Sequence, residues 1–136
     1  MPLRRTPLDV AAAALLLSAA VTMPGCAVAC PAIAYSSAVS IDTDLVPGVT
    51  AVQICVEDEC TTPPGEEPDL TSLLGVSRED DGTWTAMLDM RTPDELLIRL
   101  YDADGVLLRE YDEPIAWTFT GGACPGPATA DPVVLA

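Results

Sequence analysis

The sequence contains no histidine, no lysine and no asparagine, and each absence excludes a kind of chemistry. Without histidine, a Ser-His-Asp triad or a Cys-His nucleophile cannot be assembled, and the usual imidazole ligands of zinc or copper are missing. Without lysine, there is no P-loop phosphate contact and no Schiff base. Without asparagine, no N-glycosylation acceptor exists. We therefore predict that the protein is not an enzyme, and we predict no cofactor.

Positive charge is scarce as well. Six arginines stand against 21 acidic residues, which gives the 136-residue chain a net charge of −15. A nucleic-acid-binding protein needs a basic surface to neutralise phosphates, so we predict no nucleic-acid partner. Anionic membrane lipids would repel the chain for the same reason. The length is that of a single domain.

The N-terminal residues have the pattern of an export signal. Arg4 and Arg5 form a short positive region, and an apolar run over Val10–Met23 follows. A membrane-spanning helix needs about 20 apolar residues, so this shorter run predicts a secretory signal peptide. A buried core helix is the alternative, but the rest of the chain has no helical pattern. The paired arginines would also suit twin-arginine export, although Pro7 and Asp9 favour the general secretory route.

The apolar run ends at Met23-Pro24-Gly25-Cys26, where a small residue directly precedes a cysteine. This arrangement resembles the lipobox of bacterial lipoproteins, whose cysteine carries the lipid and becomes the mature N-terminus. We predict a signal peptide over residues 1–25, lipidation of Cys26 and a mature domain over residues 26–136. The membrane is then a partner through the lipid anchor, and the protein lies on the outer face of the cell membrane.

Two other processing sites remain open. Residues Ala27-Val28-Ala29 form an A-x-A site, and cleavage after Ala29 predicts a secreted protein without a lipid. Lipidation of Cys30 is the third option, but it leaves three cysteines, an odd number. We rank lipidation of Cys26 first and cleavage after Ala29 second.

The five cysteines are Cys26, Cys30, Cys55, Cys60 and Cys124. Lipidation of Cys26, or its removal by cleavage after Ala29, leaves four, an even number that predicts two disulfides in an oxidising compartment. Parity does not separate these two processing sites, and four cysteines allow three connectivities. We favour Cys55–Cys60, because a hairpin would close the short segment between them. We also favour Cys30–Cys124, which would join the beginning of the domain to its last strands. A metal site is disfavoured, because a Cys-x4-Cys pair with two distant partners does not have the spacing of a zinc site.

Alternation of apolar and polar residues predicts a chain made of strands. Turn signals rich in glycine and proline separate the alternating segments. Residues 60–75 form a loop-rich insert with several prolines, in which residues 69–74 have room for one helical turn. Asp104-Gly105, between two alternating runs, predicts a β-hairpin. The pattern is that of an all-β sandwich of about seven strands, over residues 33–41, 49–56, 83–90, 95–101, 106–111, 115–120 and 133–135.

The same alternation predicts which apolar side chains share a face with core residues. Ile33 lies on the face of Val39 and Ile41 in the first segment, and Met90 on the face of Trp84 in the third. Phe119 shares its face with Ile115 and Trp117. These aromatic residues, with the leucines and isoleucines, suffice for one hydrophobic core. The disulfides would supplement that core.

Several segments together carry a likeness to known proteins. They are the start Cys-x3-Cys-Pro-Ala-Ile-Ala-Tyr-Ser-Ser from Cys26, the segment Val-Gln-Ile-Cys-Val-Glu-Asp-Glu-Cys, the turn Tyr-Asp-Ala-Asp-Gly and the late Cys124. In these features, residues 26–124 resemble small lipoproteins of high-GC Gram-positive bacteria. The resemblance implies an immunoglobulin-like secreted domain on the cell surface. It implies no catalytic or binding residue.

Acidic clusters offer a second functional hypothesis. The turn Asp102-Ala103-Asp104-Gly105 does not fit the EF-hand, because its glycine stands at the fourth position and not the sixth. Residues 57–59 and 79–81 are acidic and lie near predicted loop tips. A solvated acidic surface is the preferred interpretation. A Ca²⁺-dependent binding or adhesion domain is the first alternative, and a small hydrolase with paired carboxylates is the second.

The sequence thus favours a binding module without catalysis. We predict that a lipid on Cys26 anchors it to the outer face of the cell membrane. Its loops or a sheet edge would bind a protein or cell-envelope partner. No residue in the sequence identifies that partner.

Overall fold

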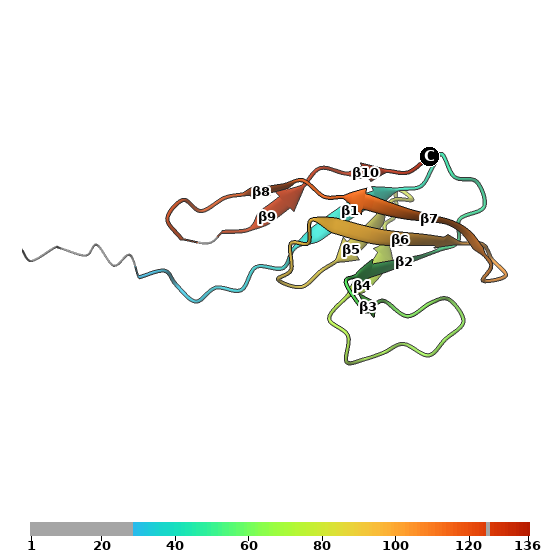
Figure 1. The fold of residues 1–136 in the computed structure, drawn as a ribbon, viewed down its shortest axis with the longest axis horizontal. Helices are drawn as coiled ribbons and strands as arrows, with labels where there is room; N and C mark the ends of the chain where they lie inside the picture. The colour runs from blue at the N-terminus through green and yellow to red at the C-terminus, as the bar shows by residue number, and fades with distance from the viewer. Residues whose placement is uncertain (1–28, 125) are drawn as a thin grey trace, which may run out of the picture.

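The computed structural model describes residues 29–124 and 126–136, and this part of the chain contains ten β-strands and no helix (Figure 1). Within the same residues, no helix is long and apolar enough to cross a membrane. The predicted all-β class is therefore confirmed. The strands are β1 (Ala38–Asp42), β2 (Ala51–Val56), β3 (Glu59–Cys60), β4 (Gly75–Arg78), β5 (Trp84–Met87), β6 (Glu95–Tyr101), β7 (Leu107–Pro114), β8 (Trp117–Phe119), β9 (Ala128–Ala130) and β10 (Val133–Val134).

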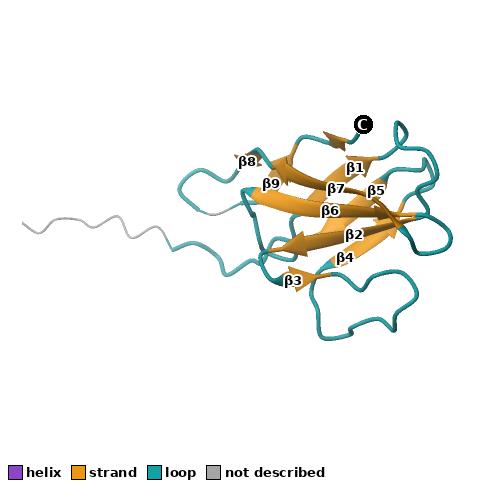
Figure 2. Cartoon of the chain, turned by 45° about the vertical axis from the view of Figure 1, so that its right-hand side comes forward, coloured by secondary structure: helices purple, strands orange, loops and turns teal. Residues whose placement is uncertain are grey.

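The strands form two four-stranded sheets and one two-stranded sheet (Figure 2). The first has the order β10-β1-β5-β4, the second has the order β3-β2-β6-β7, and β8 pairs with β9. Neighbouring strands are antiparallel except β1 and β10, which are parallel. The last strand of the chain thus lies beside the first.

One hydrophobic core joins the two four-stranded sheets. On β6, Leu96, Ile98 and Leu100 are completely buried, and the residues between them face the other side. Ile41 on β1 and Ile54 on β2 are also completely buried and belong to the same cluster. Because side chains alternate along a strand, this pattern lets one face of each sheet pack inward. The predicted alternation is confirmed for these strands.

Each of the seven predicted segments overlaps a strand, and three short strands were not predicted. They are β3, β4 and β9, which have two, four and three residues. Segments this short contain too few alternations to be recognised from sequence. In the predicted insert 60–75, residues 69–74 form one turn and no helix, in which the Ser72 N–H donates to the Asp69 carbonyl.

The first strand begins later than predicted, at Ala38 instead of residue 33. Its partner β5 ends at Met87, and the chain turns away at Asp89, whose φ is +57°. Ser37 makes the last backbone contacts, donating to the Asp89 carbonyl and accepting from Leu88. Residues before Ser37 therefore run beyond the end of β5, with no neighbouring strand there to pair with among the described residues.

The predicted hairpin is confirmed between β6 and β7. The Asp102 carboxylate accepts hydrogen bonds from the N–H groups of Asp104 (3.0 Å) and Val106 (2.9 Å). Gly105 has a φ of +76°, in the left-handed region that glycine adopts without a steric penalty. Local side-chain chemistry thus determines this turn, as it does in many turns that contain aspartate.

Both predicted disulfides are present. Cys55 and Cys60 stand opposite each other on β2 and β3, with 4.0 Å between their Cα atoms. Cys30 is bonded to Cys124, which lies 94 residues later in the chain. The predicted signal peptide and lipidation site, Cys26, lie outside the described residues. The disulfides account for four of the five cysteines in the sequence.

Loop length predicts that the two disulfides stabilise the fold unequally. In the chain-entropy model, a bond that closes a loop of 94 residues contributes about 5 kcal/mol and one that closes a loop of five contributes about 2 kcal/mol. The double variant Cys30→Ser/Cys124→Ser should therefore lose more free energy of unfolding than Cys55→Ser/Cys60→Ser. Urea unfolding of both variants and the parent measures the difference. Equal losses, or the reverse order, would contradict the prediction.

Candidate functional site

A groove lies between the N-terminal segment, which is residues 29–37, and the hairpin formed by β8 and β9. Its volume is about 670 Å³. Ile33 and Tyr35 form one wall, Phe119 and Ala128 contribute the hairpin wall, and Met90 comes from the turn after β5. Figure 1 shows the N-terminal segment and the hairpin projecting from the same end of the molecule. Two segments far apart in the sequence thus build one surface.

Side chains and backbone on both sides hold the walls in place. The Cys30–Cys124 disulfide joins the two walls directly. The Trp117 indole Nε1 donates to the Pro93 carbonyl at 2.8 Å, which attaches β8 to the loop between β5 and β6. The Ser37 hydroxyl lies within hydrogen-bonding distance of the carbonyls of Asp89 and Arg91 in the same loop, and its single proton is shared between them. The groove is therefore held together by hydrogen bonds as well as the disulfide.

The groove is mostly apolar, and the polar side chains that line it are uncharged hydroxyl groups. Ile33 is 56% exposed, Met90 61% and Phe119 66%, so three large apolar side chains face solvent around it. None of the described residues that line it is an aspartate, a glutamate or an arginine. Such a surface is suited to an apolar contact and offers no pair of carboxylates for acid–base chemistry.

The structure corrects the prediction for these three residues. Alternation placed Ile33, Met90 and Phe119 on the faces of core residues, but each lies on the surface. Ile33 precedes the start of β1, and Met90 follows the end of β5. Phe119 ends β8, which belongs to the small separate sheet. Alternation predicts burial only where a second sheet covers the strand, and these positions lie beyond that cover.

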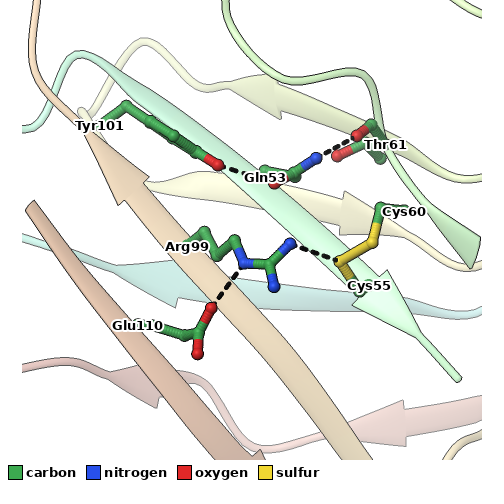
Figure 3. A network of polar contacts seen from close by, with 7 residues as sticks. All are labelled: Gln53, Cys55, Cys60, Thr61, Arg99, Tyr101 and Glu110. Carbon is green, nitrogen blue, oxygen red and sulfur yellow. Dashed lines mark hydrogen bonds and ion pairs between the residues drawn. A yellow bond between two sulfur atoms is a disulfide. The ribbon is translucent and has the colours of Figure 1, made fainter. Parts of the chain in front are cut away.

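A polar network covers the outer face of the second sheet (Figure 3). The Gln53 side chain is 5% exposed, and its Nε2 donates to the Thr61 carbonyl at 2.7 Å. The Tyr101 hydroxyl donates to Gln53 Oε1 at 2.8 Å, and Thr61 Oγ1 accepts from the Ile54 N–H. The buried amide is thus satisfied on both its donor and acceptor sides, as a stable buried polar group must be. This geometry indicates a structural role.

Arg99 occupies the centre of the same face. Its Nε donates to Glu110 Oε2 at 2.6 Å, and its Nη1 lies 3.8 Å from the sulfur of Cys55 (Figure 3). The hydrogen bond with Glu110 raises the pKa of Arg99, so the guanidinium stays charged. The pair joins β6 to β7 beside the Cys55–Cys60 disulfide. Because about a third of the Arg99 side chain is exposed, the pair contributes little stability.

The acidic clusters are used for local contacts. The Arg91 guanidinium, together with the Ser72 hydroxyl, lowers the pKa of Glu59. The Thr83 hydroxyl and N–H do the same for Asp81. Among the described residues, no group of three or more acidic or cysteine side chains is arranged to hold a metal ion. No observation of this part of the chain therefore favours the Ca²⁺ alternative.

No protein-family model, no curated protein and no solved structure matches this chain. The resemblance to small bacterial lipoproteins therefore stays a prediction, and the functional argument rests on the chain's own residues. Of the predicted site residues, Cys30, Cys55, Cys60 and Cys124 are paired as expected. The apolar groove was not predicted. The sequence signal for it is the absence of charge from both segments that form its walls.

Removal of the Tyr101 hydroxyl tests the buried amide. Tyr101→Phe leaves Gln53 Oε1 without its donor, so we expect a loss of about 1–2 kcal/mol in the free energy of unfolding. Tyr111→Phe is the matched control, because its hydroxyl donates at the surface to the Ala136 carbonyl and its loss should cost less than about 0.5 kcal/mol. Chemical unfolding measures both. Similar losses would show that burial of Gln53 does not matter.

Acid should remove the contribution of Glu59. Because the folded protein lowers the pKa of this carboxyl below its ordinary value of 4.5, it stabilises the fold above that pH. The contribution is lost as the pH falls through the lowered pKa. We expect Glu59→Gln to be less stable than the parent at neutral pH, with the difference shrinking below pH 4.5. Urea unfolding across this pH range measures the difference, and Glu66→Gln, at an exposed position, is the control. A difference in the free energy of unfolding that stays constant with pH would refute the prediction.

Proposed function

We propose that the chain is a non-catalytic module held on the outer face of the cell membrane by a lipid on Cys26. The two disulfides support export, on which this proposal depends. They pair four of the five cysteines and leave Cys26, which directly follows the apolar run and a small residue. Disulfides persist in oxidising compartments, so the pairing is consistent with export. An exported protein with one remaining cysteine at the end of its signal fits the lipoprotein pattern.

We also propose that the domain is an immunoglobulin-like sandwich. Its strand order supports this, because β1-β5-β4 and β3-β2-β6-β7 follow the B-E-D and C′-C-F-G orders of that fold. The position of strand A, at the edge beside β1, is occupied by the C-terminal strand β10, which runs parallel to β1. The disulfides also differ from the usual inter-sheet bond between strands B and F, since Cys55–Cys60 joins neighbouring strands of one sheet.

The absence of catalysis is supported by the kind of surface that the fold presents. The groove between the N-terminal segment and the β8–β9 hairpin is lined by uncharged side chains in the described part of the chain. Hydrogen bonds from Arg91 and Ser72 lower the pKa of Glu59 and keep it ionised. Those from the Thr71 and Thr83 hydroxyl groups do the same for Asp69 and Asp81. A hydrolase with two carboxylates needs one whose pKa is raised so that it can act as the acid.

A sheet edge supports the binding role. β7 ends its sheet and has eight residues, most of them exposed. Val106, Leu107 and Leu108 are exposed apolar residues where this strand begins. An extended segment of a protein partner can add to such an edge through main-chain hydrogen bonds. We therefore place the partner-binding role of the module at this edge and at the neighbouring loops.

The mass of the processed protein tests the anchor. We expect a diacylglyceryl group on Cys26 as the first residue, and four cysteines that react with an alkylating agent only after reduction. Cys26→Ser is the control, because it removes the lipid and leaves both disulfides. A mature chain that begins at Cys30 without lipid would make the protein a secreted one. Cysteines that react before reduction would contradict export itself.

A further inference from the structure

We propose that the apolar groove between the N-terminal segment and the β8–β9 hairpin rests in the surface of the lipid bilayer to which Cys26 is anchored. This inference rests on the proposed lipid anchor and assigns the groove a single occupant, the boundary between lipid headgroups and acyl chains. Ile33, Met90 and Phe119 are the side chains that would enter it.

The first argument is the distribution of charge. Charged residues make up 20% of the sequence, yet residues 29–41 and 114–130 contain none. The first run supplies one wall of the groove and the second supplies the hairpin wall. Both runs therefore meet at one end of a chain whose net charge is −15. Two uncharged walls suit a bilayer contact, because a charged side chain is costly to move into lipid. The nearest charges are those beside Met90, where Arg91 is paired with Glu59.

The second argument is the length of the connection to the lipid. Cys30 follows Cys26 by four positions, so the chain between their Cα atoms extends at most about 14 Å. Cys30 is bonded to Cys124, which itself lines the groove. A lipid on Cys26 thus holds this end of the domain, and not another, close to the bilayer. The N-terminal segment and the hairpin leave the body of the domain in the same direction (Figure 1).

The third argument is the shape of the surface. The three large apolar side chains are more than half exposed, so they project from the rim of the groove. Apolar side chains at membrane surfaces enter about 5–10 Å into the boundary between headgroups and acyl chains. The acidic remainder of the domain is repelled by anionic headgroups, which favours the same orientation. Repulsion of the acidic remainder and burial of the apolar side chains therefore favour the same orientation of the domain.

A tryptophan at the rim reports contact with lipid. We would prepare the processed, lipid-bearing protein with Phe119→Trp and place it in phosphatidylcholine vesicles, with and without bromine on the acyl chains. Bromine quenches an indole that it touches. After subtraction of the parent's emission from Trp84 and Trp117, we expect the introduced indole to show a blue shift and to lose emission in brominated vesicles.

The matched control is Leu70→Trp, because Leu70 is 92% exposed and lies in the loop between β3 and β4, outside the groove. Its indole should keep its emission in brominated vesicles. If the indoles at both positions are unquenched although the mass shows the lipid on Cys26, the inference is wrong and the anchor stands. If quenching is equal at the two positions, the groove has no preferred contact and the inference is also wrong. A mass without lipid overturns the anchor and the inference together.

Discussion

The hydrophobic contact between the two four-stranded sheets is the interaction on which the rest of the molecule depends. Its centre is formed by completely buried residues of four strands, among them Ile41, Ile54 and Ile98. Burial of each such side chain stabilises the folded state by about 1.5–3 kcal/mol. The short strands and the long insert attach to this core through local contacts, such as Ser72 and Arg91 on Glu59. Neither the insert nor the small β8–β9 sheet contributes a comparable core of its own.

The two disulfides outside that core differ in the segments that they join. Cys55–Cys60 joins neighbouring strands and closes a short turn, next to the satisfied amide of Gln53. Cys30–Cys124 instead joins two segments that project beyond the sheets and that share no sheet. Without this bond, the N-terminal wall of the groove would depend on the contacts of Ser37 with the turn after β5. The Cys30–Cys124 disulfide and the non-covalent contacts of Ser37 therefore both hold the N-terminal wall of the groove in place.

The proposed anchor and the charge of the chain fit together physically. A domain with a net charge of −15 is repelled by anionic lipids, so an anchor must overcome that repulsion at the point of attachment. The diacylglyceryl group of a lipoprotein supplies two acyl chains, which is enough for stable attachment. In the proposed orientation, the uncharged walls of the groove lower the repulsion where the domain comes closest to the bilayer. Of the acidic clusters, the one over residues 57–59 lies near the groove, because Glu59 pairs with Arg91, the residue between the groove residues Met90 and Thr92.

Periodicity, turn chemistry and cysteine parity let the sequence by itself determine the all-β class, the Asp104-Gly105 hairpin and the number of disulfides. These features depend on neighbours in sequence or on simple counting, whereas the favoured pairing of Cys30 with Cys124, 94 residues apart, was established only by the structure. Only the tertiary structure determined that Ile33, Met90 and Phe119 are exposed. Alternation assigns a side chain to a face, but burial depends on whether another sheet covers that face. Where β5 ends and the small sheet begins, that cover is missing, and three residues with a core-like pattern form the rim of a groove.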